Sequence, residues 1–343
     1  MTKKTNANKK ITIKDVAKSA GVSIGTVSHV FNNYPDISLK TRARVKEIAD
    51  QLHYFPSIVA RSLTYKNQKT IALILNDMNI DRKVSISTDV ISGVFRFCKE
   101  TNAQFVFYAT TLQGQREKSY DQFCEERNIT GAVVQGLRTT DPYYHQMEKT
   151  DFPTVLIDMD NKNKQVGAIS IDNQEAARQV TDFLITRGHR KIVFVNGNSN
   201  TYVSQRRLAG FKLALRQNSL PFDANFVITA DFNEEIAYQK TKEFLAVHPD
   251  ASAFFASSDL MALGILKAIR DLGKNVPEDI SVFGFDNIAL GEYLTPSLCS
   301  VEQDMGSIAY QAAALLNKLI SRQEVKNKFL ISNFELIIRD SVN

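Results

Sequence analysis

Aspartates that follow short apolar runs are the residues of this sequence best suited to hydrogen-bond a ligand. Runs such as "PTVLID", "GAISID" and "SVFGFD" end in this residue. Ligands of doubly wound sheets bind outside the carboxyl ends of the strands, so we expect a cleft with carboxylates in its walls. The aspartates concerned are Asp77, Asp158, Asp172, Asp231, Asp259 and Asp286. Asp172 and Asp259 each open a clear helical pattern, so for these two the alternative is that they cap a helix.

Motifs of catalytic, metal or cofactor sites do not explain the sequence. The patterns G-x-G-x-x-G and H-E-x-x-H are missing, as is a P-loop. Cys98, Cys124 and Cys299 are scattered and lack metal-ligand spacing, so we expect buried thiols in a reduced compartment. An enzyme is the first alternative function, because doubly wound sheets often host catalysis. The missing motifs argue against it, and we expect no metal and no cofactor.

After Ile71 the sequence alternates between short β-rich runs and segments of helical periodicity. The runs include "TIALIL", "KIVFVNG" and "ISVFGFD". The segment "NQEAARQVTDFLITRGH" places Ala176, Val180 and Leu184 on one helical face, and Gly188 ends the pattern. Apolar strands alternating with helices predict parallel, doubly wound sheets that are covered on both faces. The segment is too long for one ordinary sheet, so we expect two α/β lobes.

The positive charge of the chain is concentrated in its first part. Residues 1–70 carry 13 Lys and Arg against 4 Asp and Glu, a net charge of +9. The remainder carries 29 against 33, a net charge of −4, so the +5 of the whole chain hides a basic head on a mildly acidic body. This asymmetry favours a polyanion as the partner of the head alone. On charge alone, a solvated basic tail is the alternative.

Two short helical patterns flank Gly21 in the stretch "DVAKSAGVSIGTVSHVF" at residues 15–31. The glycine and a cap-type serine separate them, which predicts a helix-turn-helix whose second helix enters the DNA major groove. A third helix is expected to begin after Ser38. The apolar residues expected to hold these helices together are Val16, Ala17, Ala20, Val22, Val27, Val30, Val45, Ile48, Ala49 and Leu52. A generic three-helix bundle is the alternative, but the charge asymmetry and the breaker spacing together favour DNA.

The sequence shows no sign of a membrane or secreted protein. No stretch reaches the length of about 18 consecutive apolar residues that a transmembrane helix needs. The basic start, "MTKKTNANKKITIKDVA", is followed by no apolar segment, which argues against a secretory signal. We therefore expect a cytoplasmic protein that is associated with the nucleoid.

Ordered motifs run along the whole chain. The head contains "ITIKDVAKSAGVSIGTVSHVFNN" and "ISLKTRARVKEIADQLHYFPSIVARSL", and the body contains "RRLAGF", "SSDLMALG", "PEDISVFGFDN" and "PSLCSVEQDM". From residue 11 to about 340 the chain thereby resembles the lactose/galactose repressor (LacI/GalR) family. The resemblance implies an all-α helix-turn-helix headpiece, a hinge helix and a two-lobed α/β effector domain like that of periplasmic sugar-binding proteins. It also implies a homodimeric repressor on a palindromic operator in double-stranded DNA.

Position by position, the resemblance implies three kinds of DNA contact. The residues placed at the major groove are Ser23, Ile24, Gly25, Thr26, Ser28, His29 and Asn32. Those placed at the phosphate backbone are Thr12, Ser38, Thr41 and Tyr54. The hinge would insert Ala60 and Leu63 into the minor groove, where an apolar wedge can bend the duplex. Without the resemblance, the hinge segment would be interpreted as a plain linker.

The resemblance further implies a small, sugar-like effector in the cleft between the lobes. The residues at the family's ligand positions are Asp77, Asp158, Arg207, Phe232, Ser258, Asp286 and Gln303. Their chemistry suits a polyol, because carboxylates accept hydrogen bonds from hydroxyl groups, Arg207 donates them and Phe232 can cover an apolar sugar face. The alternatives are a surface cation for Arg207 and core packing for Phe232.

Some positions depart from the family's pattern. His29 stands where most members have arginine, and a neutral imidazole cannot make the charged bidentate contact to guanine, so a different operator base is expected. Ser57 and Ser258 each replace an asparagine that is common in the family. The segment "NDMNIDRKVSISTDVISG" is longer than usual, which sets the cleft mouth at residues 77–81 apart from the family.

The expected domain boundaries follow from the same resemblance. They are a basic tail at 1–10, a headpiece at 11–56, a hinge helix and linker at 57–69, and an effector-binding and dimerisation domain at 70–343. Its N-terminal lobe would hold about 70–160 plus 290–321, and its C-terminal lobe about 162–288 plus 322–343. The apolar stripe expected to pack within the N-terminal lobe is Ile308, Ala312, Leu315, Leu316 and Leu319.

Two further functions stay open as alternatives. A ligand-binding protein for uptake would need a signal peptide and no basic head. A regulator could also depend on a partner protein as corepressor, which the sequence neither indicates nor excludes.

Overall fold

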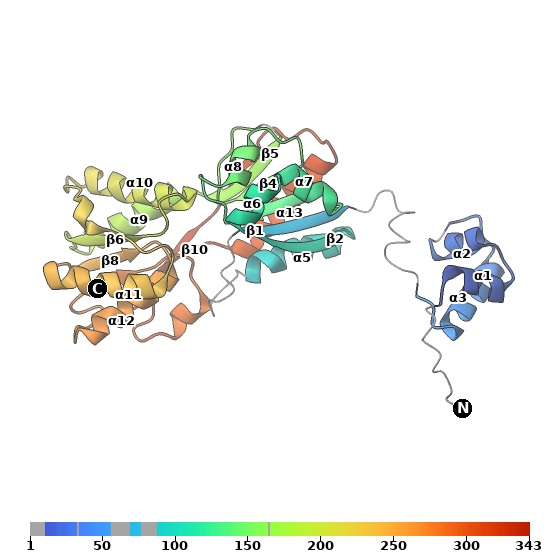
Figure 1. Ribbon diagram of the computed structural model, residues 1–343. Coiled ribbons are helices and arrows are strands. Elements are labelled where there is room, and N and C mark those ends of the chain that lie inside the picture. Colours follow the sequence, from blue (N-terminus) through green and yellow to red (C-terminus); the bar gives the residue numbers. More distant parts are fainter. Residues whose placement is uncertain (1–10, 33, 56–68, 77–87, 164) are drawn as a thin grey trace, which may run out of the picture. The chain divides into compact units, whose positions relative to one another are not determined.

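The computed structural model describes residues 11–32, 34–55, 69–76, 88–163 and 165–343. They form two compact units, one within Met1–Gln68 and one within Lys69–Asn343 (Figure 1). The first unit is all-α and the second is α/β, and each has hydrophobic clusters of its own. The fold class expected from the sequence is therefore confirmed.

The first unit, which we call the headpiece, is a bundle of three helices. They are α1 (Ile13–Ala20), α2 (Ile24–Phe31) and α3 (Leu39–Gln51). Gly21 ends α1 with a φ of 63°, a left-handed conformation that glycine adopts without steric cost. The buried residues are Val16, Ala17, Ala20, Val27, Val30, Val45 and Ala49, and Val22, Ile48 and Leu52 pack against them. The predicted helix-turn-helix and its apolar contacts are confirmed.

The first lobe of the second unit is built on a parallel six-stranded sheet. In spatial order its strands are β11 (Phe329–Ser332), β5 (Val166–Ile171), β4 (Thr154–Ile157), β3 (Gly131–Gln135), β1 (Thr70–Asn76) and β2 (Gln104–Thr110). One hydrophobic cluster joins the sheet to α5 (Thr88–Thr101) and α13 (Met305–Ile320). A second hydrophobic cluster joins the other face of the sheet to α7 (Tyr120–Glu126) and α8 (Pro142–Met147), and α6 (Leu112–Glu117) contacts α8. The apolar stripe of α13 is buried in this lobe, as expected.

The second lobe has a smaller parallel sheet of four strands. In spatial order these are β7 (Val227–Thr229), β6 (Ile192–Asn196), β8 (Ala253–Ala256) and β9 (Ser281–Phe283). Helices α9 (Asn173–Thr186) and α10 (Tyr202–Gln217) cover one face, and α11 (Glu234–Val247) and α12 (Asp259–Asp271) cover the other (Figure 1). This lobe also contains the 3-10 helices Ala224–Phe226 and Ala289–Tyr293. A separate two-stranded antiparallel sheet is formed by β10 (Ser300–Glu302) and β12 (Glu335–Ile337).

The strand pairing corrects the lobe boundaries expected from the sequence. We expected residues from 162 onward, and again from 322, in the second lobe, yet β5 and β11 pair with each other in the first sheet. The reverse holds after residue 290, because Leu298 is buried in the second lobe's core and Gly284 N donates to Cys299 O. β5 is buried along its whole length, so its sequence reads the same in either lobe.

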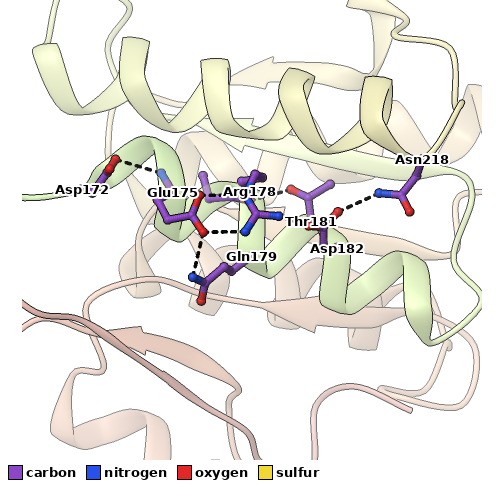
Figure 2. A network of polar contacts seen from close by, with 8 residues as sticks. Asp172, Glu175, Arg178, Gln179, Thr181, Asp182 and Asn218 are labelled. Carbon is purple, nitrogen blue, oxygen red and sulfur yellow. Dashed lines mark hydrogen bonds and ion pairs between the residues drawn. The ribbon is translucent and has the colours of Figure 1, made fainter.

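Helix α9 shows how local pattern and tertiary contact combine. Its apolar face carries Ala176, Val180 and Leu184, all fully buried as predicted. Its polar face carries Arg178, which pairs with carboxylates one turn before and after it (Figure 2). One of these, Asp182, also accepts a hydrogen bond of 2.7 Å from Asn218 at the end of α10, which ties the two helices together.

The cysteines and the hydropathy of the described helices agree with the expectations from the sequence. Cys98, Cys124 and Cys299 are buried and unpaired. Burial raises the pKa of Cys98 to about 11 and that of Cys124 to about 12, which keeps both as unreactive thiols. In the parts of the chain that the structure describes, no helix combines the length and the apolar character that crossing a bilayer requires.

Candidate functional site

Helix α2 of the headpiece presents a face to solvent that is free of large charged side chains. Ile24 is 45% exposed, and Gly25 is exposed beside it. A Cβ added at Gly25 would meet only Ser23 Oγ, at 3.6 Å, which is an ordinary contact. Folding therefore does not require glycine at this position. The small side chain at Gly25 instead leaves room for another molecule to approach α2 closely.

Hydroxyl side chains mark the helix starts of the headpiece. Ser23 caps α2 by accepting from Thr26 N at 3.0 Å, and Ser38 caps α3 by accepting from Thr41 N at 3.2 Å. At α1, Asp15 accepts from both N and Oγ1 of Thr12. These residues were expected at DNA from the resemblance, and the structure places them at helix N-termini, which favour anions such as phosphate. Their contacts with DNA stay a prediction.

Gly21, Ser23 and Gly25 also match the pattern G-x-S-x-G of hydrolase nucleophiles. In such enzymes the serine lies on a sharp turn between a strand and a helix. Here the serine follows α1 instead of a strand, and its Oγ caps α2. The match therefore carries no catalytic meaning.

The remaining residues expected at DNA have mixed positions. Ser28 Oγ accepts from Asn32 Nδ2 at 3.2 Å, and Asn32 Oδ1 is buried without a partner among the described residues. Tyr54 packs edge-on against Phe31 and is half-buried, so the headpiece core holds much of its ring. Ala60 and Leu63 lie outside the described residues, as does Ser57.

The second unit contains a hollow of about 800 Å³ that both lobes line. Its walls are Asn76, Gln135, Gly136, Leu137, Arg138, Ile157, Asp158 and Met159 from the first lobe, and Asn198, Thr201, Val203, Asp231, Phe232 and Ile236 from the second. The volume lies within the usual range for small-molecule sites, roughly 300–1,000 Å³. Two of the expected effector residues, Asp158 and Phe232, are brought together here. The walls also contain Arg138, Asn198 and Thr201, which were not among the residues expected there.

Asp286 and Gln303 line a separate, smaller hollow of about 260 Å³. Gln303 Nε2 donates to Asp286 Oδ1 at 2.7 Å, whereas Gln303 Oε1 is buried without a partner among the described residues. Buried acceptors are almost always hydrogen-bonded, so this oxygen is suited to receive a donor from a bound molecule. Of the other expected residues, Asp77 lies outside the described residues.

Arg207 lies in the protein interior, and its charge attracts the carboxylates of Asp158, Asp259 and Asp286. It is 3% exposed, and its guanidinium carbon lies 3.5 Å from the centroid of the Phe285 ring. Nη1 donates to Ser257 O at 2.6 Å and Nε donates to Asn173 Oδ1 at 2.8 Å. A surface cation, which was the alternative considered from the sequence, would be exposed, so that alternative is wrong. Arg207 is instead a buried, oriented donor.

A chain of hydrogen bonds leads from Arg207 to Asp158. Asn173 accepts from Arg207 and donates through Nδ2 to Ser170 Oγ at 2.9 Å, and Ser170 donates to Asp158 Oδ1 at 2.7 Å. The chain runs from α10 of the second lobe through α9 and β5 to the end of β4 in the first. Nothing in the local sequence around Asn173 or Ser170 indicates these partners, so neither residue was expected at the site.

Burial shifts the proton affinities of this cluster. It raises the pKa of Asp286 to about 6 and that of Asp259 to about 7, the latter with help from the Asp286 charge. Burial also raises the pKa of Asp158, while it lowers the pKa of Arg207 against the attraction of the neighbouring carboxylates. A ligand that donates hydrogen bonds to these acids would stabilise their charged forms.

The strand-end aspartates fall into two kinds, as the alternatives allowed. Asp172 caps α9 by accepting from Glu175 N at 3.0 Å. Asp259 opens α12 but does not cap it, since its carboxylate accepts from Ile288 N and Ser300 Oγ. The cap of α12 is Ser258, whose Oγ accepts from Met261 N at 3.3 Å and lines neither hollow. Ser258 thus serves α12, and like Arg207 it is not part of the lining of either hollow.

The backbone turns sharply at the strand ends that reach the hollows. Asp158, Asp231, Phe232 and Asp286 have φ values of 59°, 51°, 54° and 106°. Asp tolerates this region, but an aromatic residue rarely adopts it, and such strain is concentrated at functional sites. The ring of Phe232 lies so close over Gly197 that an added Cβ would be 2.1 Å from its Cζ. Glycine is thus needed at 197 to seat this ring.

The two units match two known types of domain. Residues 12–57 match the family described as "Bacterial regulatory proteins, lacI family". Residues 181–342 match the family described as "Periplasmic binding protein-like domain".

Similar proteins match nearly the full chain. The "Probable HTH-type transcriptional repressor ExuR" of Bacillus subtilis (strain 168) is 32% identical over 334 residues, which are 97% of this chain and 98% of that protein. The "HTH-type transcriptional repressor PurR" of Vibrio vulnificus (strain CMCP6) is 30% identical over 333 residues, or 96% of this chain and 98% of that protein.

Two solved structures are similar over the same length. A "transcriptional regulator CelR-cellobiose complex" has a TM-score of 0.74 and 29% identity, and covers 96% of this chain and 99% of its own. A lac repressor dimer bound to operator and the anti-inducer ONPF has a TM-score of 0.85 and 24% identity, and covers 97% and 99%. At that identity the second likeness shows the fold alone.

Proposed function

We propose a ligand-responsive repressor, on the premise that this chain belongs to the LacI family of bacterial regulatory proteins. Members of this family are DNA-binding transcriptional regulators, which sets aside the enzyme that doubly wound sheets could have hosted. The headpiece binds a palindromic operator, and a small molecule in the cleft of the second unit controls that binding. It acts in the cytoplasm, on DNA of the nucleoid.

The headpiece reads the operator through the exposed face of α2. Small side chains at Gly25 and Ser28 admit the edges of the bases, and the capped starts of α2 and α3 lie against phosphates. Two copies of the chain bind together, because a palindrome offers two equal half-sites. Ala60 and Leu63 widen and bend the minor groove between the half-sites.

The effector is a small polyhydroxylated molecule, such as a sugar. The observation that carries this proposal is the hydrogen-bond chain from Arg207 to Asp158, which ends at the hollow that both lobes line. At this hollow the Asp158 carboxylate accepts hydrogen bonds from hydroxyl groups, and Phe232 offers a face for C–H groups. The likeness to a cellobiose complex supports a sugar.

The ligand acts by favouring one arrangement of the lobes over another. A ligand shifts such an equilibrium only through its different affinity for the two states. A coupling of about 1–3 kcal/mol, typical of allosteric proteins, would change operator affinity roughly 5- to 150-fold. A protein corepressor would be a second input to the same equilibrium.

Calorimetry with a panel of sugars, sugar phosphates and nucleosides tests the effector. The ligand with the highest affinity is then added to an operator-binding measurement with the full chain. We expect a sugar to bind and to change operator affinity at least fivefold, the low end of the coupling given above. If only nucleosides bind, the proposed ligand class is wrong, and if a bound sugar leaves operator affinity unchanged, the cleft does not control the headpiece.

A further inference from the structure

His29 on α2 is held from two sides. Its Nδ1 lies 2.9 Å from Oδ2 of Asp36, and its ring stacks on that of Tyr34 with centroids 4.6 Å apart and an interplanar angle of 24°. Both partners lie in the connection between α2 and α3. The His29 side chain is nevertheless 43% exposed. One edge and one face of the imidazole are thus supported, and part of the side chain remains accessible to solvent.

The support of His29 is part of the headpiece fold. Arg42 of α3 donates from Nη2 to Tyr34 O at 2.7 Å and from Nη1 to Val30 O at 3.3 Å. Tyr34 N in turn donates to His29 O at 3.0 Å. The connection that carries Tyr34 and Asp36 is thus fastened to both flanking helices. The position of the imidazole is prepared before any DNA binds, which lowers the entropy lost on recognition.

The contact with Asp36 decides which nitrogen of His29 carries the proton. An ionised carboxylate only accepts hydrogen bonds, so Nδ1 must be the N–H donor in this pair. In a neutral imidazole the other nitrogen, Nε2, then has a lone pair and accepts. In the major groove, the amino groups of adenine N6 and cytosine N4 donate, whereas guanine presents the acceptors N7 and O6.

We propose that Asp36 and Tyr34 are positioning residues that present His29 Nε2 as a hydrogen-bond acceptor, so that each half-site must offer it the amino group of adenine or cytosine. The inference rests on the proposed function, because it requires α2 to lie in the major groove. It assigns a base preference that the presence of a histidine alone does not determine. An unsupported imidazole can exchange tautomers and accept either pattern, whereas this one is fixed as an acceptor.

DNA selection tests the base preference. The full chain at pH 8, where an ordinary imidazole is neutral, selects from a pool of palindromes with randomised half-sites. We expect one position in each half-site to be enriched in adenine or cytosine, and His29→Ala to lose the preference at that position alone. Asp36→Asn can donate from its amide to Nδ1 and so permits a proton on Nε2. This variant should gain guanine or thymine at the same position by about fivefold or more, the lower range for a mismatched base pair.

Two further variants test the roles of charge and of stacking. Asp50→Asn removes the same charge from an exposed position of α3 and should keep the wild-type preference. Tyr34→Ala removes the ring that stacks on His29 and should weaken the preference at the same position. Circular dichroism of each variant shows whether the headpiece remains helical.

The tautomer itself is visible in the imidazole nitrogen resonances. The chain has five histidines, so histidine-labelled protein gives few signals, and His29→Ala identifies the one required. We expect the wild type and Asp50→Asn to carry the proton on Nδ1, and Asp36→Asn to carry part of it on Nε2. This measurement needs no DNA and would not respond to a merely structural role of Asp36.

Three results would overturn the inference. A wild-type preference for guanine at the His29 position would show that Nε2 donates. An unchanged preference and an unchanged tautomer in Asp36→Asn would show that Asp36 does not position the ring. If the wild type enriches no sequence at all, the proposed DNA-binding function fails, and the role of His29 fails with it.

Discussion

The headpiece and the ligand cleft use polar side chains in opposite ways. In the headpiece, the capping pairs Ser23–Thr26 and Ser38–Thr41 join residues three positions apart at exposed sites. In the network that ends at the cleft, buried Arg207 bonds to Asn173 and Ser257, which are 34 and 50 positions away. The first arrangement leaves polar groups in water for a large partner. The second prepares them inside a folded unit, where low dielectric strengthens each interaction.

This contrast predicts how the headpiece and the cleft respond to salt and to pH. Exposed charges attract a polyanion by displacing its counterions, so salt weakens that attraction. Buried charges are poorly screened, and their state depends on desolvation and on direct partners. The same chain should therefore have one binding activity that is sensitive to salt and another that is sensitive to packing and protonation.

The largest expected effect is the salt dependence of operator binding. If the basic head contacts six to ten phosphates, affinity should fall by roughly 10³–10⁵ between 50 and 200 mM salt, while effector binding changes little. Fluorescence anisotropy with a selected operator and calorimetry with the effector measure the two. A protein beginning at Lys69 should keep effector binding and lose operator binding. A flat salt response, or DNA binding without the head, would remove the contrast between the regions.

Replacing Arg207 should damage the cleft and spare the headpiece. Arg207→Ala removes the positive charge that attracts the buried acids and leaves Asn173 Oδ1 without its donor. Truncating one partner of a buried charged pair costs about 2 kcal/mol or more, roughly 30-fold in affinity. Calorimetry with the effector measures this loss. The matched control is Arg206→Ala, because Arg206 is the exposed neighbour on the same helix.

The Arg207 result needs a check on folding. Thermal unfolding should show that Arg207→Ala retains a cooperative transition, and Arg207→Lys should restore part of the affinity because it keeps the charge without the planar fork. Equal effector binding by the Arg207 and Arg206 variants would mean that the cleft has been placed wrongly.

Stability of the second unit should fall as pH rises. Burial raises the pKa of Asp259 to about 7, so the folded state binds this proton more strongly than the unfolded chain does. Between roughly pH 4 and pH 7 the unfolded state therefore loses the proton first, and the free energy of unfolding decreases as pH increases. The decrease from this buried group is on the order of a few kcal/mol.

Unfolding midpoints of wild type and Asp259→Asn at several pH values test this. The variant cannot release the proton, so its stability should depend less on pH over the same interval. Asp172→Asn is the control, since it changes an exposed capping carboxylate to another good cap. Parallel pH curves for the wild type and Asp259→Asn would show that this carboxyl is ionised in the folded state.

The smallest effects should come from two glycines, one in each region. Gly197→Ala would force the Phe232 ring to move, because the new Cβ would lie 2.1 Å from it, and overpacking of this kind costs about 1–3 kcal/mol. It should weaken effector binding. Gly25→Ala meets no such obstacle and should stabilise α2 by up to about 1 kcal/mol while it weakens operator binding. Thermal unfolding and the two binding measurements separate the outcomes.

Unchanged binding by either glycine variant would contradict the role given to that glycine. If Gly25→Ala binds the operator as well as wild type does, close approach at α2 is not required. If Gly197→Ala binds the effector normally, the Phe232 ring does not cover the ligand. Gly114→Ala on α6, whose new Cβ would have an ordinary contact of 3.5 Å, gives the baseline for both.

Much of the headpiece could be predicted from the sequence, and less of the cleft. The helices, the Gly21 turn, the capping roles of Ser23 and Ser38 and the core around Val27 are as expected. In the cleft, the sequence pointed to the acids at strand ends but not to the partners of Arg207. It also did not foresee that Ser258 caps α12 while Asp259 bonds elsewhere.

Caps and apolar faces could be predicted from the sequence, because they depend on neighbours within about one helical turn. A cap bonds a backbone group two or three positions on, and an apolar face repeats every three or four residues, so both leave a local pattern. Tertiary structure alone decided that β5 and β11 join the first sheet and that Asn173 and Ser170 connect Arg207 to Asp158. A buried strand has the same composition in either lobe, and a buried amide has the same local sequence whatever it bonds. Only the packing of segments far apart in the chain selects among those partners.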